Sequence, residues 1–392
     1  RPKVRFKGFT DDWEQRKLEE LVGIYDGVHQ TPDYQDSGIM FLSVENIATL
    51  KSEKYISEEA FERDYKVYPE KGDILMTRIG DVGTTNVVET AEKVAFYVSL
   101  ALLKPNEIDS YFLSNAMKTN AFQKGLRERT LVTAIPQKIN KDEIGKIDIF
   151  ITNNDEEQKK IGAYFSNLDH LITFHQRKCE QTKKLKKYML QKMFPKEGQT
   201  VPEVRFEGFT DAWEKRKFGD LGSVSMCRRI FKEQTATEGD IPFYKIGTFG
   251  GEPDAFISRA LFEEYKEKYQ YPEVGDMLIS ASGTIGRTVE YAGEDAYFQD
   301  SNIVWFKHDD RVDNSFLKCI YSSVKWSGIE GSTIKRLYND NFLKTEFSMP
   351  NAEEQKKIGE YFQNLDHLIT LHQRKCDELQ NIKKFMLQNM FI

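Results

Sequence analysis

The sequence predicts an α+β protein with two similar mixed domains and a pair of long helices. One observation is an internal repeat, because Pro2–Lys17 recurs 200 positions later as Pro202–Lys217 with 12 of 16 positions identical. Another is a pair of matching tails, Glu156–Cys179 and Glu353–Cys376, which are identical at 21 of 24 positions. Each copy therefore has a Trp-containing leading segment, a body and a helical tail. A repeat of this length is too long for a solenoid, so two domains of one fold are the simpler interpretation.

The two bodies diverge, although the segments around them hardly do. In the body of the first copy, the residue pattern predicts β-rich runs at Gly38–Val44, Asp73–Arg78 and Val94–Leu103. It also predicts helices near Ser57–Tyr65 and Tyr111–Gly125. Drift after a gene duplication should not spare the tails while it changes the bodies. We therefore interpret the bodies as domains that do one kind of job on two different targets.

Apolar residues recur at spacings of mostly three and four in each tail, which predicts a helix with a coiled-coil-like seam. Asn154, Asp155 and Asn351 are candidate N-caps, and Pro195 is expected to stop the first helix. Because a single apolar seam needs a partner, the two helices should pack together. The residues expected on the seam are Ile161, Phe165, Leu168, Ile172, Ile358, Phe362, Leu365 and Ile369. The expected boundaries are 1–152 and 197–350 for the domains, and 153–196 and 351–392 for the helices.

Composition and charge exclude some classes of protein. With 39% hydrophobic and 30% charged residues, the chain is not mainly disordered. The net charge of −6 hides an asymmetry, since residues 156–196 carry ten Lys/Arg against four Asp/Glu, a balance of +6 that leaves −12 elsewhere. Any nucleic-acid contact is therefore expected from local patches. The longest near-apolar run, residues 94–103, is too short to cross a membrane, and no secretory leader is expected. Four Cys make no disulfide framework, so we expect a reducing, cytoplasmic setting.

Motifs for catalysis are missing from the sequence. It contains no Gly-Lys-Ser/Thr phosphate loop and no His-Glu-x-x-His helix, and the two copies share no candidate nucleophile or acid–base pair. This argues against an enzyme and against a cofactor. Two His and two Cys in the tails would approach a zinc-like set if the helices paired at that level, namely His175, Cys179, His372 and Cys376. Packing near the seam is the stronger interpretation, and no metal is expected.

Two Gly-flanked loops are more suggestive of binding. Gly72–Thr85 aligns without gaps with Gly275–Thr288, and each is a strand leading into a loop with two glycines three apart. Such a loop lets backbone approach a ligand closely, while Thr, Ser and Arg contact phosphates or base edges. An ordinary hairpin with solvated polar residues explains the spacing equally well. The candidate DNA-binding residues here are Thr77, Arg78, Thr84, Thr85, Ser280, Ser282, Thr284 and Arg287. Further basic candidates, each equally well interpreted as a solvated charge, are Lys138, Arg228, Arg229, Lys245, Lys335 and Arg336.

The ordered set of motifs resembles the specificity (S) subunit of a type I restriction-modification enzyme over essentially the whole chain. The resemblance rests on the Phe-Lys/Glu-Gly-Phe-Thr-Asp-x-Trp-Glu motif at Phe6–Glu14 and Phe206–Glu214. It also rests on the duplicated Gly-Asp-x-Leu strands and the duplicated tails that begin Glu-Glu-Gln-Lys-Lys-Ile-Gly. Singly these motifs are weak, but the repeated, ordered set is specific.

The resemblance implies two target-recognition domains separated by a pair of long antiparallel helices, a coiled-coil spacer, with a pseudo-two-fold internal repeat. Each domain would read one half of a bipartite DNA sequence, and the spacer would fix the gap. The implied partners are double-stranded DNA, two modification (methyltransferase) subunits and restriction (translocase-nuclease) subunits. The chain itself would be non-catalytic, and its acidic bodies predict weak DNA affinity without those subunits.

A structural adaptor is the alternative class of function, and a DNA methyltransferase is a third class that the motifs argue against. A non-enzymatic adaptor could bind proteins through two domains on a helical rod, and its binding would be insensitive to salt, unlike binding to DNA. A self-sufficient methyltransferase acting on amino groups would resemble its family through an Asn/Asp-Pro-Pro-Tyr/Phe motif. No Pro-Pro pair occurs in this sequence.

Overall fold

The computed structural model describes residues 1–331 and 334–392, and these form two compact units. The first unit contains residues 1–176 and 373–392, and the second contains residues 177–372. Each unit therefore combines one body with one end of each long helix.

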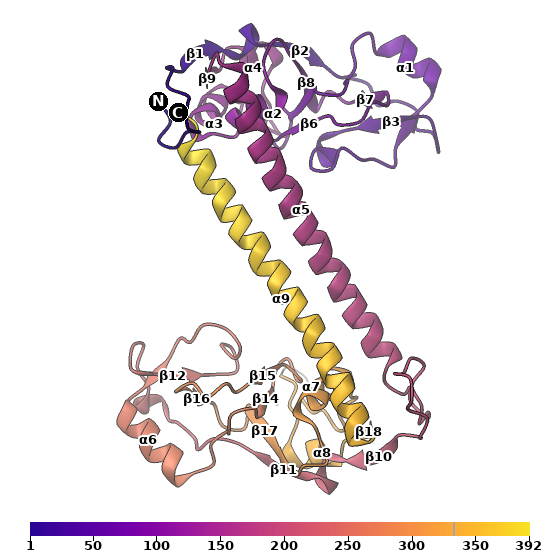
Figure 1. The fold of residues 1–392 in the computed structure, drawn as a ribbon, viewed down its shortest axis with the longest axis vertical. Coiled ribbons are helices and arrows are strands. Elements are labelled where there is room, and N and C mark those ends of the chain that lie inside the picture. The colour runs from indigo at the N-terminus through magenta and orange to yellow at the C-terminus, as the bar shows by residue number, and fades with distance from the viewer. Residues whose placement is uncertain (332–333) are drawn as a thin grey trace. The chain divides into compact units, whose positions relative to one another are not determined.

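The first unit is a mixed domain of nine strands and four short helices among the described residues (Figure 1). Its strands are β1 (Glu14–Lys17), β2 (Val22–Asp26), β3 (Ile39–Leu42), β4 (Tyr55–Ile56), β5 (Ile74–Thr77), β6 (Thr85–Val87), β7 (Val94–Phe96), β8 (Leu100–Pro105) and β9 (Asp148–Ile151). Its short helices are α1 (Glu58–Asp64), α2 (Ser110–Ala116), α3 (Asn120–Arg129) and α4 (Lys141–Gly145). The strands form an antiparallel sheet of order β2-β8-β5-β6, a sheet of order β4-β3-β7 and the pair β1-β9.

The central strand β5 shows how the body is built. Ile74 and Met76 lie in a core with α2, α3 and α4, whereas Leu75 lies in a second core with β3, β7 and α1. Successive side chains of a strand point to opposite faces, so the four-stranded sheet is covered on both sides. This explains why the predicted run Asp73–Arg78 is apolar without alternation.

The second unit repeats this topology in its own residues. Its strands are β10 (Glu214–Lys217), β11 (Gly222–Ser225), β12 (Ile241–Tyr244), β13 (Phe256–Ile257), β14 (Met277–Ser280), β15 (Thr288–Glu290), β16 (Tyr297–Phe298), β17 (Ile303–His308) and β18 (Glu346–Met349). Its short helices are α6 (Arg259–Lys268), α7 (Asn314–Ser323) and α8 (Asn339–Lys344). The sheet orders β11-β17-β14-β15, β13-β12-β16 and β10-β18 match those of the first unit strand for strand. The bodies thus keep one fold although their sequences diverge.

The two tails form the long helices α5 (Asp155–Lys192) and α9 (Ala352–Asn389). The Asn154 side-chain oxygen accepts a hydrogen bond from the Glu157 amide at 3.1 Å, and Asn351 accepts one from Glu354 at 2.9 Å. The predicted caps Asn154 and Asn351 are therefore confirmed. The first helix ends at Lys192, shortly before Pro195.

Within each unit the two long helices run antiparallel. In the first unit, the rings of Phe165 and Phe391 lie 5.8 Å apart and Asp169 pairs with Lys383 at 2.5 Å, so numbers rise along one helix and fall along the other. In the second unit the same holds for Lys186 with Asp366 and for Phe194 with Phe362. The predicted seam residues buried in these units are Ile161, Phe165, Leu168, Ile172, Ile358, Phe362 and Leu365. Ile369 is only half-buried.

Two predicted elements in the first body are wrong in extent. The apolar run Val94–Leu103 is two strands, because the chain turns at residues 97–99, where the Leu100 amide bonds the Tyr97 carbonyl at 2.9 Å. The predicted helix Tyr111–Gly125 is two helices, α2 and α3. Thr119 breaks it, since its hydroxyl bonds the Ala116 carbonyl at 2.8 Å and caps the Phe122 amide at 3.4 Å.

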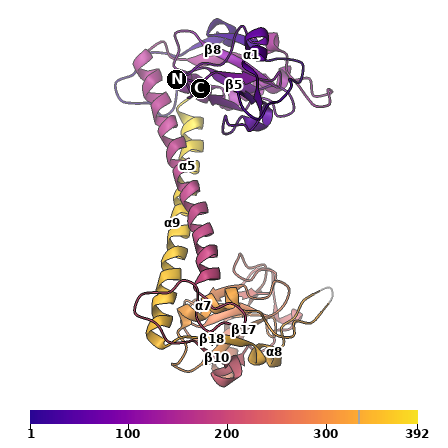
Figure 2. The same ribbon diagram turned by 90° about the vertical axis from the view of Figure 1, so that its right-hand side faces the viewer.

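The two chain ends lie side by side in both views of the first unit (Figures 1 and 2). The Val4 amide donates to the Asn389 carbonyl at 2.8 Å, and in the second unit the Val204 amide donates to the Lys192 carbonyl at 2.9 Å. Each leading segment therefore satisfies a carbonyl at the last turn of a long helix, a group that has no partner within the helix. In the described part of the chain, no helix is both long and apolar enough to cross a membrane.

Candidate nucleic-acid interface

The glycine loops, residues 77–85 in the first unit and 280–288 in the second, follow the central strands β5 and β14. In the first, the Thr77 amide bonds the Thr84 carbonyl and the Gly83 amide bonds the Thr77 carbonyl, both at 2.9 Å. The Ser280 amide makes the matching bond to Arg287 at 2.9 Å. Gly80 and Gly83 have φ of 83° and 101°, a region in which glycine is favoured because it lacks a Cβ. The predicted strand-to-loop architecture is present in both units.

Several predicted contact residues hold the glycine loops from inside. Thr77 is buried, and its hydroxyl accepts from the Thr84 amide at 2.9 Å, as the buried Ser280 hydroxyl does from Arg287 at 2.9 Å. Thr85 meets the Ser114 hydroxyl at 3.0 Å, and Ser282 donates to the Asn302 side chain at 2.7 Å. These four hydroxyls therefore shape the loops, and their contact with DNA stays a prediction.

The two arginines of the glycine loops have different surroundings. Arg78 is 6% exposed, forms an ion pair with Asp26, and donates from Nε to the Ile139 carbonyl at 3.2 Å. Arg287 is exposed, and its Nη1 donates to the Phe249 carbonyl at 2.9 Å. Arg78 therefore ties three parts of the first unit together, while Arg287 is presented to solvent. Neither role was evident from spacing alone.

The remaining predicted residues lie on the surface of their own unit. Arg229 pairs with Asp300 at 2.8 Å, the Arg228 guanidinium lies 5.2 Å from the centre of the Tyr269 ring, and half-buried Lys245 pairs with Asp254 at 2.8 Å. Those classed as exposed are Thr84, Lys138, Arg228, Arg229, Thr284, Arg287, Lys335 and Arg336. Their contact with DNA also stays a prediction.

A second loop in each unit, missed in the sequence, packs against the glycine loop. We call it the tip loop: residues 130–138 in the first unit and the described part of 329–336 in the second. In the first unit the Gly80 amide donates to the Gln137 carbonyl at 2.9 Å, and the Leu131 amide donates to the Lys138 carbonyl at 2.8 Å. This brings Lys138 beside Ile79 of the glycine loop.

The second unit builds the same pairing from different side chains. The Gly283 amide donates to the Lys335 carbonyl at 2.9 Å, and the Glu330 amide donates to the Arg336 carbonyl at 3.0 Å. Lys335 and Arg336 thereby join the glycine loop of their unit. The sequence signal for a tip loop was the apolar run near Leu131 between basic residues, which we did not recognise.

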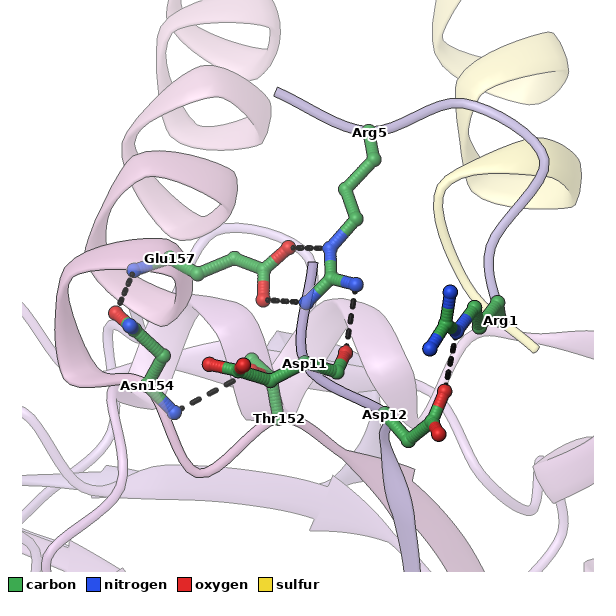
Figure 3. Close-up of polar contacts among 7 residues, drawn as sticks. All are labelled: Arg1, Arg5, Asp11, Asp12, Thr152, Asn154 and Glu157. Atoms are coloured by element: carbon green, nitrogen blue, oxygen red, sulfur yellow. Dashed lines mark hydrogen bonds and ion pairs between the residues drawn. The ribbon is translucent and has the colours of Figure 1, made fainter. Parts of the chain in front are cut away.

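A buried ion pair fixes each leading segment to the start of a long helix, and Figure 3 shows the pair of the first unit. Arg5 donates from Nε and Nη2 to the two Glu157 oxygens at 2.5 and 2.8 Å, and Arg205 binds Glu354 in the same way at 2.7 and 2.8 Å. Both carboxylates are fully buried, and the hydrogen bonds to Glu157 raise the pKa of Arg5. Sequence analysis missed this pair, although all four residues lie in the two most similar stretches of the repeat.

Figure 3 also shows how the first leading segment is held beyond this pair. Arg5 Nη1 donates to the Asp11 carbonyl at 2.6 Å, and Arg1 pairs with Asp12. With β1 paired to β9, the segment joins both ends of the body to the first turn of α5. Within residues 1–331 and 334–392, no group of three or more His, Cys, Asp and Glu is placed to hold a metal ion.

These features define a class of protein: two copies of one mixed domain, each with paired loops on its sheet and each continuing into a long helix. The family model described as "Type I restriction modification DNA specificity domain" matches residues 10–184 and again residues 210–381. The chain belongs to this family and is a specificity subunit with two such domains. This confirms the resemblance and the fold class predicted from the sequence, and nothing in the comparisons supports the adaptor alternative.

Similar proteins carry the same description. A Haemophilus influenzae protein named as a type I restriction enzyme specificity subunit is 57% identical over 158 residues, which is 39% of this chain and 41% of that protein, so this match spans less than half of its length. The MjaX specificity subunit of Methanocaldococcus jannaschii is 23% identical over 97% of this chain and 93% of its own. The crystal structure of a type I S subunit from M. genitalium has the same fold, with a TM-score of 0.68 and 15% identity over 100% of this chain and 99% of its own.

Proposed function

We propose that each unit reads one half of a bipartite, asymmetric DNA sequence and that α5 and α9 set the gap between the halves. The observation that carries the proposal is the contrast between the two family domains. Their topology, leading segments and helices are repeated, whereas their loops carry different side chains. Two different readers on one scaffold fit a target with two unlike halves.

We further propose that the chain supplies recognition and that separate subunits supply chemistry. The implied partners are two modification subunits that methylate DNA and restriction subunits that translocate and cut it. The near-identical leading segments and tails suit two copies of one partner, because equal surfaces bind equal subunits. Since the substrate is cellular or incoming DNA, we place the complex in the cytoplasm.

The length of the helices suits a spacer of this kind. At about 1.5 Å per residue, the 38 residues of α5 make a helix of about 57 Å. Half-sites on one face of duplex DNA lie about 34–36 Å apart for each helical turn, so a helix of this length can set their separation.

Exchange of one body tests the proposal. Residues 21–149 are replaced by the body of a relative with another target, the variant is expressed with its modification subunits, and the methylated sequences of the genome are determined. We expect a change in one half of the recognised sequence only, because the second body is untouched. A change in both halves, or no methylation pattern that depends on this chain, would contradict the proposal.

A further inference from the structure

The tip loop of the first unit presents apolar side chains to solvent. Ile135 is 100% exposed, Val132 is 69% exposed and Leu131 is 45% exposed. Single exposed apolar residues are common on proteins and need no explanation. Three within five positions of one loop form a patch, and such patches mark binding surfaces.

Hydrogen bonds hold the base of the tip loop in place. Its base is closed by the bond from the Leu131 amide to the Lys138 carbonyl at 2.8 Å. Gln137, near the C-terminal end of the loop, is tied to the glycine loop twice, from the Gly80 amide to the Gln137 carbonyl at 2.9 Å and from the Gln137 side chain to the Gly80 carbonyl at 3.0 Å. A surface held in this way loses little conformational entropy when it binds.

The charge around the patch identifies its partner. Residues 130–138 contain no Asp or Glu, and Lys138 is exposed at the base of the loop. The last turn of the preceding helix α3 carries Arg127 and Arg129 with the exposed Glu128 between them, so this turn is also positive on balance. An apolar tip on a positive base fits a DNA groove, in which phosphates line the rim and base edges form the floor.

The second unit places a comparable side chain on its own tip loop. Ile334 is 59% exposed and is followed by the exposed residues Lys335 and Arg336. The two tip loops share almost no sequence, yet each joins an exposed isoleucine to basic residues beside a glycine loop. The combination therefore occurs in both units, although the loop sequences have diverged.

We propose that the tip loop of the first unit enters a groove of the half-site that this unit reads, with Ile135 and Val132 against the bases and Lys138 at a phosphate. Apolar side chains contact the thymine methyl group or the faces of bases at opened steps, and both contacts depend on sequence. The inference rests on the proposed function and deepens it, because it names side chains that read bases. The buried hydroxyls of the glycine loop then act by holding the tip loop in place.

Binding by the variant Ile135→Ser tests the proposal. The variant and the wild type are each assembled with modification subunits. Their affinities for a duplex that contains the sequence methylated by the wild-type complex are then measured at several salt concentrations. We expect roughly tenfold weaker binding, the effect of one lost base contact, with an unchanged dependence on salt. Lys138→Gln should instead lower the salt slope by about one, because a phosphate contact is lost. The methylated sequence of Ile135→Ser should relax in one half only.

Matched variants keep the test decisive. Val274 of the second unit is 74% exposed and lies outside both paired loops, so Val274→Ser should bind as the wild type does. Ile135→Leu keeps an apolar tip and should retain affinity. Equal melting temperatures are expected for all of these variants, because the side chains are on the surface.

Three outcomes would overturn the inference. The first is affinity of Ile135→Ser within twofold of wild type with an unchanged methylated sequence. The second is loss of assembly with the modification subunits, which would make the tip loop a protein contact. The third is a changed salt slope for Ile135→Ser. A wild-type complex that prefers no duplex would instead overturn the proposed function itself.

Discussion

The pair of Arg5 with Glu157 shows what a single buried contact contributes to this protein. The Glu157 carboxylate is fully buried, and the Arg5 side chain is 13% exposed. Removal of one partner from a buried pair leaves an uncompensated charge, which costs about 3–5 kcal/mol. The same geometry at Arg205 and Glu354 indicates that each leading segment depends on it.

Arg5→Ala is therefore expected to destabilise the first unit by about 3 kcal/mol. Hydrogen exchange measured by mass spectrometry should show lost protection in residues 1–176 and 373–392, with the second unit unchanged. Arg16→Ala is the control, because Arg16 pairs with Glu20 at the surface, where an ion pair contributes less than about 1 kcal/mol. Equal effects of both variants would mean that the buried pair has no special role.

Lys118 predicts a pH dependence at the residue scale. Burial, aided by the Lys383 ammonium, lowers the pKa of Lys118 to about 8 from 10.5. Between these values the unfolded chain holds a proton that the folded unit lacks, so this group makes stability rise with pH from about 8 to 10.5.

Lys118→Met should remove that rise and stabilise the first unit at pH 7 by about 1 kcal/mol, because no charge is then buried. Both effects are measured by comparing the melting temperatures of the variant and the wild type at pH 7 and at pH 10. Lys124→Met is the control, since Lys124 is exposed on α3. A variant with the same pH dependence as wild type would show that Lys118 is not the group responsible.

At the scale of elements, the glycine loop depends on a close approach at Gly83. A Cβ there would lie 2.2 Å from the Leu126 Cδ2, which is buried in the core, and Gly83 has φ of +101°. Gly80 has φ of +83° and open space around it. The two glycines three apart therefore have different reasons to be glycine.

Gly83→Ala should destabilise the first unit by about 2–3 kcal/mol, from strain and a displaced Leu126. Gly80→Ala should cost about 1 kcal/mol, from backbone strain alone. Chemical denaturation of the two variants compares them directly. A larger effect at Gly80 would contradict this account of the loop.

The same elements show how far the sequence could predict the fold. Local signals worked where the cause is local: Ser57 caps α1 through the Ala60 amide at 3.1 Å, and Asn154 caps α5. Two local breaks were still missed: Thr119 bonds Ala116 and Phe122, and Leu100 bonds Tyr97 at the turn before β8, each inside a run that otherwise looks like one element. The tip loop could not be placed, because Ile79 pairs with Lys138 across 58 intervening residues and no local pattern encodes that register.

The candidate site was predicted less completely than the fold. The internal repeat pointed to the glycine loops. The type of a polar residue does not reveal whether its side chain is buried, so Thr77 and Arg78 were predicted to contact DNA. Side chains that hold a loop and side chains that touch a ligand have the same chemistry in sequence. The tip loop was missed for the opposite reason. Its apolar residues would ordinarily be expected to be buried, whereas the structure exposes them.

At the scale of the whole molecule, the repeat links two unlike readers through helices that are nearly the same. The antiparallel pairing seen within each unit gives both helices a role in the spacer. If the spacer sets the gap, a longer spacer should increase the number of base pairs between the two half-sites. One added helical turn of four residues lengthens a helix by about 6 Å, and one base pair of DNA spans about 3.4 Å.

The most direct test inserts four residues into the middle of both α5 and α9 and determines the sequence methylated by the assembled complex. The account predicts two unchanged half-sites separated by a gap longer by about one or two base pairs. An unchanged gap, or half-sites that change with the insertion, would contradict the claim that two independent readers are spaced by these helices.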